Sequence, residues 1–200
     1  MKRGSSSFQG VALVFLLGTL LVGSTAFAQA GPSTDRSAAD GSFQAQNHLA
    51  AAVQQRLMQR QLDFMMAPIK SRDALMRYMQ NHPNSPLSAL SAGARQRFVD
   101  SLVFTPRGLG GYYYADLEAE LSASQIYRIL SLFGAQASTP LLQNARVDNA
   151  TDALILSMPS GITSTSGDFT SIGDGDYKDY RCIARATCET DDTYICMHSC

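Results

Sequence analysis

The stretch RCIARATCETDDTYICMHSC, residues 181–200, holds all four cysteines of this 200-residue chain. An even number of cysteines gathered in so short a segment is typical of a disulfide-bonded module in an exported protein. We therefore expect Cys182, Cys188, Cys196 and Cys200 to form two disulfides. Each bridge closes a loop of roughly 10–20 residues and stabilises the fold by about 3 kcal/mol, because it lowers the entropy of the unfolded chain.

The pairing of these cysteines is open, because four cysteines allow three connectivities. A bond between Cys196 and Cys200 closes too short a loop to constrain the chain. We favour Cys182 with Cys196 and Cys188 with Cys200. The nested pairing, Cys182 with Cys200 and Cys188 with Cys196, is the close alternative. A zinc site is the weaker interpretation, since only the last two cysteines have the spacing of a zinc knuckle.

Residues 1–30 have the pattern of a secretion signal. Basic residues open it, residues 11–23 form an apolar run, and small residues follow, with cleavage expected after Ala28 or Ala30. The apolar run is shorter than the roughly 20 residues that span a bilayer, so an uncleaved anchor is the weaker alternative. The pattern predicts a secreted or periplasmic protein that meets the membrane only during export.

Beyond the signal we expect four segments. These are a flexible leader at 31–42, a helical domain at 43–146, a polar linker at 147–180 and the cysteine-rich module at 181–200. The linker prediction depends on a dense Gly, Ser, Thr and Asp run within it. The predicted fold class is therefore mainly α: a small helical bundle or irregular helical array, followed by a polar linker and a short disulfide-stapled C-terminal module.

Polar capping residues mark the starts of the predicted helices, and proline or glycine marks their ends. The starts are Ser71, Ser91 and Ser122, and the ends are Pro68, Pro83, Pro106 and Gly134. The clearest helix starts where Ser122 and Gln125 match a capping box. A last helix is expected at 139–146.

The segment RGLGGYYY, residues 107–114, joins the third and fourth predicted helices. Its glycines permit unusual backbone conformations, and Tyr112, Tyr113 and Tyr114 offer large amphipathic contact area. We interpret it as a candidate binding loop. In the alternative interpretation the rings fill the core and the glycines only make a turn. The segment lacks both the Lys-Ser/Thr pair of a phosphate loop and the glycine spacing of a dinucleotide site.

Residue patterns that indicate catalysis are scarce. The three histidines are His48, His82 and His198. The acidic residues that come nearest to a catalytic cluster are Asp116, Glu118 and Glu120. These acidic residues are interpreted as a solvated face, and the sequence has no nucleophile elbow. The aspartates near residue 174 do not follow the order of an EF-hand loop. We therefore expect no cofactor and no resident metal, and the sequence does not favour an enzyme.

The charge balance excludes a nucleic-acid-binding protein, because 16 Lys and Arg stand against 17 Asp and Glu. The main hypothesis is an exported, non-enzymatic protein. Its helical domain would be a carrier or pro-region for the disulfide-bonded peptide, which would act as a secreted effector. The alternative is a periplasmic or extracellular binding protein that uses the tyrosine loop and the bundle surface. A secreted enzyme is the weaker alternative. The partner, protein or small molecule, is not identified by the sequence.

Overall fold

The computed structural model describes residues 35–159 and 175–200. The predicted signal, the first four residues of the predicted leader and the centre of the predicted linker lie outside these residues, whereas the rest of the leader belongs to helix α1. Contacts divide the chain into units of residues 1–41 and 42–200. Of the first unit only the beginning of helix α1 is described, and the fold below is that of the second.

Helices make up 52% of the described part of the chain. In chain order they are α1 (Asp35–Met66), α2 (Arg72–Asn81), the 3-10 helix η1 (Pro86–Ala89), α3 (Ala92–Ser101), α4 (Ala115–Glu120), α5 (Ala123–Ser131), the 3-10 helix η2 (Gln136–Leu141) and α6 (Ala150–Ser157). Several predicted boundaries are confirmed. Ser71 and Ser91 cap α2 and α3, and Ser122 with Gln125 forms the capping box of α5. Gly134 has a φ of 70°, as a glycine after a helix end often does.

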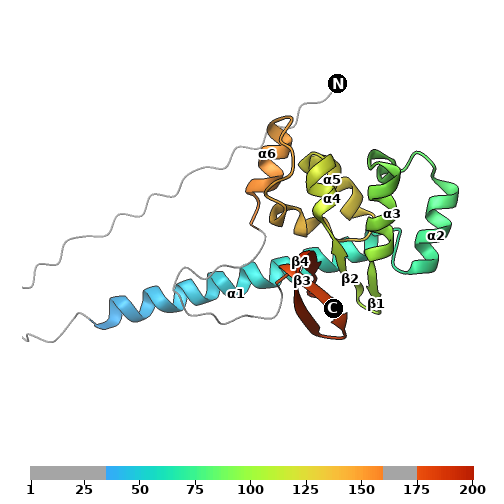
Figure 1. Ribbon diagram of the computed structural model, residues 1–200. Helices are drawn as coiled ribbons and strands as arrows, with labels where there is room; N and C mark the ends of the chain where they lie inside the picture. Colours follow the sequence, from blue (N-terminus) through green and yellow to red (C-terminus); the bar gives the residue numbers. More distant parts are fainter. Residues whose placement is uncertain (1–34, 160–174) are drawn as a thin grey trace, which may run out of the picture. The chain divides into compact units, whose positions relative to one another are not determined.

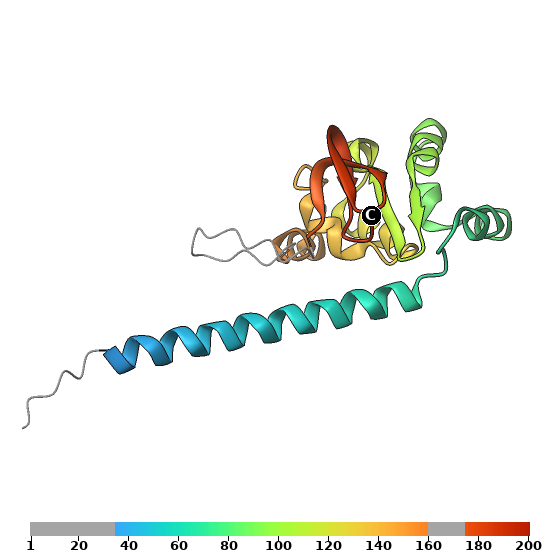
Figure 2. The same ribbon diagram turned by 90° about the horizontal axis from the view of Figure 1, so that it is seen from below.

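The mainly α prediction is wrong, because strands make up 21% of the described residues and form one antiparallel sheet. Its strands are β1 (Val103–Thr105), β2 (Gly108–Tyr113), β3 (Tyr177–Ala184) and β4 (Thr187–Cys196), in the order β1-β2-β4-β3. The hairpin β3–β4 lies beside β2 in both views (Figures 1 and 2). The segment predicted as a separate module, together with the last four residues of the predicted linker, therefore supplies half of a sheet whose other half lies in the predicted helical domain.

The core joins the sheet to the helices. Tyr112 on β2 and its register partner Ile195 on β4 are both fully buried. The Tyr112 ring packs edge-on against Phe98 of α3, with 6.1 Å between ring centroids, and its hydroxyl lies 2.8 Å from Ser138 Oγ of η2. Burying aromatic and branched side chains is the main source of stability, so β4 belongs to the same hydrophobic core as α3 and η2.

Part of the predicted linker is also ordered. Asn149 caps α6 by accepting bonds from the amides of Thr151 and Asp152, at 2.8 and 3.2 Å. Ile155 is buried on the inner face of this helix. The capping box of Asn149 and Asp152 thus starts a helix within the polar sequence.

Candidate functional site

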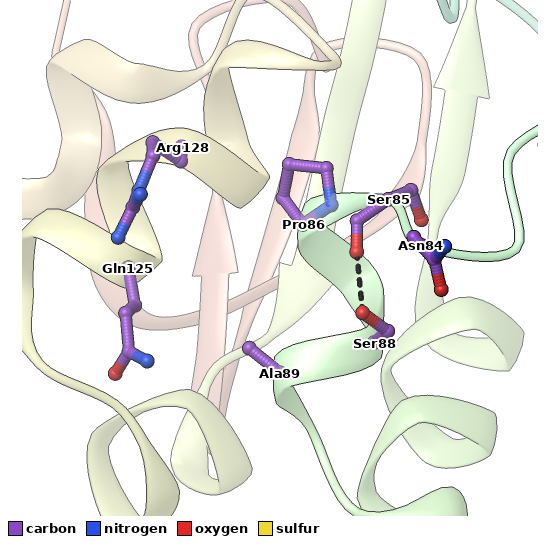
Figure 3. A pocket seen from close by; sticks show the side chains of 7 residues that line it. All are labelled: Asn84, Ser85, Pro86, Ser88, Ala89, Gln125 and Arg128. Atoms are coloured by element: carbon purple, nitrogen blue, oxygen red, sulfur yellow. Dashed lines mark hydrogen bonds between the residues drawn. The ribbon is translucent and has the colours of Figure 1, made fainter.

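A pocket of about 290 Å³ lies on the surface between η1 and α5. Its lining residues are Asn84, Ser85, Pro86, Ser88, Ala89, Gln125 and Arg128. Figure 3 shows Gln125 and Arg128 on α5 across from Asn84, Ser85 and Ser88. None of the seven lining residues is acidic, and one carries a positive charge, so the pocket suits a ligand with negative charge.

The polar groups of the pocket are partly fixed by hydrogen bonds. Arg128 Nε donates to the carbonyl of Ser124, 3.3 Å away, and Ser88 Oγ donates to the carbonyl of Ser85 at 2.8 Å. Gln125 Oε1 accepts from the amide of Ser122 at 2.9 Å, so its amide nitrogen is the group it can offer to a ligand. The pocket therefore combines a guanidinium with amide donors on a partly pre-ordered frame.

A second polar cluster is buried and joins three distant parts of the chain. Arg60 Nη1 of α1 donates to Asp176 Oδ1 at 3.0 Å, and the backbone amide of His198 donates to the same oxygen at 3.0 Å. The His198 ring lies against both side chains through Nδ1. Arg60 is 6% exposed and the Asp176 side chain is fully buried.

The charge on Asp176 is kept despite this burial. Burial alone would raise the pKa of its carboxyl, but the hydrogen bonds from His198 and the charge of Arg60 outweigh burial and lower the pKa below its usual value. The carboxylate is thus ionised and neutralises Arg60. Asp176 belongs to the aspartates near residue 174 that do not follow the order of an EF-hand loop, and in the structure it forms this ion pair.

The structure places the three tyrosines of the candidate binding loop on strand β2 and at the start of α4. Tyr112 is fully buried and Tyr114 is 7% exposed, whereas Tyr113 is half-buried and packs edge-on against Tyr194. The Tyr114 hydroxyl donates to Asp179 Oδ1 at 2.5 Å. Burial and this bond raise the pKa of Tyr114. Tyr113 is thus the only one of the three that offers substantial surface to a partner.

The two predicted disulfides are present, in the nested pairing of Cys182 with Cys200 and Cys188 with Cys196. The connectivity we favoured is therefore wrong. Cys182, Cys196 and Cys200 are buried, and their sulfur atoms all lie within 4.8 Å of one another. Cys188 is half-buried and does not belong to that group.

Two glycines of β2 allow neighbouring strands and the Cys182–Cys200 disulfide to approach closely. A Cβ atom on Gly110 would lie 2.9 Å from Cγ2 of Thr105 on β1, and 3.4 Å from the Cys182 sulfur and from the Cα of Cys200. A Cβ on Gly111 would lie 2.8 Å from the carbonyl oxygen of Ile195 and 3.3 Å from the Cβ of Cys182. These glycines are therefore explained by the close approach of Thr105 to Gly110 and of β4 and Cys182 to Gly111, rather than by a flexible loop.

The acidic cluster of the sequence is divided among separate partners. Asp116 pairs with Arg97 at 2.8 Å, Glu118 with Lys178 at 3.0 Å, and Glu120 accepts from the Ser91 hydroxyl at 2.7 Å. The other two histidines are elsewhere: His48 is exposed on α1, and the His82 ring stacks on Tyr78. The fold thus does not gather these residues into one site.

Sequence reasoning missed both the pocket and the buried cluster. The pocket residues belong to a turn and to the polar face of a helix, and neither pattern differs from ordinary surface. Arg60 and Asp176 are 116 positions apart, so no local spacing indicates their contact.

Comparison with protein-family models, with curated proteins and with solved structures finds no match to this chain. Among the described residues, no helix has both the length and the apolar character needed to cross a membrane.

Proposed function

We propose that the protein is exported and acts outside the cytoplasm as a binding protein for a small anion, a carboxylate or a phosphate. The observation that carries the proposal is the pocket between η1 and α5, where Arg128 and amide groups meet without an acidic neighbour in the lining. Its volume of about 290 Å³ is at the small end of ligand sites, which usually span about 300–1,000 Å³. A small carboxylate or phosphate fits both the size and the charge.

Two features support the location. Residues 1–30 have the pattern of a secretion signal, and paired cysteines persist chiefly in oxidising compartments outside the cytoplasm.

The shared sheet favours a binding protein over a carrier of a releasable peptide. Release of the C-terminal hairpin would remove β4 from the side of β2 and take the fully buried Ile195 out of the core. Exposing such a side chain costs about 1.5–3 kcal/mol, and the edge of β2 would be left unpaired as well. The hairpin is therefore better understood as part of the binding domain.

A titration tests the proposed function. The purified protein would be titrated with a panel of small mono- and dicarboxylates and with inorganic phosphate, followed by calorimetry. We expect at least one compound to bind, and Arg128→Gln to weaken its affinity about tenfold or more, equivalent to about 1.4 kcal/mol.

Arg77→Gln is the matched control, because Arg77 is an exposed arginine on α2 that does not line the pocket. It should leave the affinity unchanged. Failure of every compound to bind, or equal weakening by both substitutions, would contradict the proposal.

A further inference from the structure

The two disulfides differ in how easily a thiol in solution can reach them. Cys188 is half-buried, whereas Cys182, Cys196 and Cys200 are at most 5% exposed. Attack on a disulfide needs access to one of its sulfur atoms. Of the four cysteines Cys188 is therefore the most accessible to an external thiol, and the Cys182–Cys200 bridge is shielded.

The sulfur released by such an attack lies next to the shielded bridge. When a thiolate bonds to Cys188, the leaving group is the Cys196 thiolate. Cys196 Sγ is within 4.8 Å of both sulfurs of the Cys182–Cys200 bridge. Cys188 Sγ lies outside this group, so the two ends of the exposed bridge are not equivalent.

We propose that the two disulfides form an exchange relay. An external thiol opens the Cys188–Cys196 bridge, and the released Cys196 thiolate then attacks the buried Cys182–Cys200 bridge. In the first step the thiolate of a low-molecular-weight thiol bonds to Cys188 Sγ, and the Cys188–Cys196 bond breaks. Cys196 leaves with the electron pair as a thiolate.

In the second step the Cys196 thiolate attacks Cys182 Sγ, and the Cys182–Cys200 bond breaks. A Cys182–Cys196 disulfide forms, and the Cys200 thiolate takes up the proton that the external thiol lost. The two steps start from two disulfides and one external thiol. They end with a mixed disulfide on Cys188, the Cys182–Cys196 disulfide and one thiol on Cys200.

The surroundings of Cys200 suit the new thiol. Cys200 Sγ lies 3.1 Å from the carbonyl oxygen of Ala184 and 3.4 Å from that of Thr187. Both distances suit hydrogen bonds from an S–H donor. The relay thus ends on a sulfur that already has acceptors in place.

A pair of single substitutions tests the relay. Cys188→Ser leaves a free thiol on Cys196, inside the sulfur group, whereas Cys196→Ser leaves one on Cys188, outside it. Each variant would be held at mildly alkaline pH, alkylated, and mapped by mass spectrometry without reduction. We expect the label in Cys188→Ser on Cys200 as well as on Cys196, and the label in Cys196→Ser on Cys188 alone.

Label confined to Cys196 in the first variant, or equal scrambling in both, would overturn the relay. A measurement on the unaltered protein guards against misfolded variants. Addition of one equivalent of glutathione, followed by rapid alkylation, should give an adduct on Cys188 and an alkylated Cys200. A first adduct on Cys182 or Cys200, or an alkylated Cys196 alone, would equally contradict the proposal. Both experiments are independent of the anion pocket.

Discussion

Cys182 and Cys188 face each other in the register of the β3–β4 hairpin, yet neither is bonded to the other. Each bonds instead to a cysteine further along the chain. The Cα atoms of Cys188 and Cys196 are 6.0 Å apart, whereas eight residues of straight strand would span roughly 26 Å. Register shifts and the positive φ of 80° at Thr193 accompany this bending of β4. The disulfides therefore hold a folded-over hairpin rather than a flat one.

Replacing Cys182 and Cys200 together by Ala should destabilise the whole of residues 42–200. The bridge spans 18 residues, which corresponds to about 3 kcal/mol in the chain-entropy model. Because Ile195 is part of the common core, helices and hairpin should unfold together at a lower urea concentration. Far-ultraviolet circular dichroism and tyrosine fluorescence would follow the two parts. Loss of the hairpin with an unchanged helical signal would show that the hairpin is a separate module after all.

Gly111→Ala should destabilise the protein by about 2 kcal/mol. The new methyl group would lie 2.8 Å from the carbonyl oxygen of Ile195, which is backbone and cannot move aside without disturbing β4. Gly93→Ala on α3 is the control. The nearest atom to its Cβ is the Arg97 side chain at 3.5 Å, and alanine favours helix over glycine. Thermal unfolding should show a lower midpoint for the first variant and an equal or higher one for the second.

Asp176→Asn should cost about 3–5 kcal/mol, because it removes the negative charge that neutralises the buried Arg60. The comparison is Asp191→Asn, which removes an ion pair with Arg181 in which both side chains are exposed. Such surface pairs contribute at most about 1 kcal/mol. Urea unfolding at neutral pH would measure both variants. Equal effects of the two substitutions would mean that the buried pair is no more important than a surface pair.

Stability should fall in acid partly through Asp152. Its carboxylate accepts bonds from the amides of Ser124, Asp148 and Asn149, at 2.7, 2.9 and 3.2 Å. The bonds from Ser124, followed by those from the other two amides, lower the pKa of Asp152 to about 2, against 3.8 for the free group. Because the pKa is lower in the folded state, this stabilisation is present above about pH 4 and is lost as the pH falls towards 2.

The test compares urea midpoints at neutral pH and at successively lower pH. Asp152→Asn should lower the midpoint at neutral pH and flatten its decline below pH 4. Asp148→Asn is the control, since the Asp148 side chain is about half exposed and pairs with the exposed Arg146. An unchanged acid profile in Asp152→Asn would show that the hydrogen bonds to its carboxylate do not contribute.

The parts of the fold that the sequence predicted are those set by neighbours in the chain. Ser71, Ser122 and Gly134 mark helix boundaries because capping depends on amides and carbonyls within four residues. The presence of disulfides followed equally well from the cysteine count and the signal pattern.

The sheet and the sites depend on distant residues and were missed for that reason. Strand β2 contains three glycines, so its sequence alone indicates a loop. Only its pairing with the distant β4 identifies it as a strand. The disulfide connectivity is associated with the bend of β4 near Thr193. This residue has a positive φ, which is unusual for a non-glycine residue and cannot be predicted from the sequence. The sequence is compatible with Tyr112 either on a contact surface or in the core. Its pairing with the buried Ile195 places it in the core.

The order β1-β2-β4-β3 also has a consequence for the timing of folding. The strand made last lies in the interior of the sheet, between one made much earlier and one made just before it. During synthesis β1 and β2 leave the ribosome long before β4. Until β4 follows, the β1–β2 hairpin has an unpaired edge, and Tyr112 lacks its partner Ile195. Such long-range pairing slows folding. The sheet is therefore expected to stay incomplete until β4, with Cys188 and Cys196, has been synthesised.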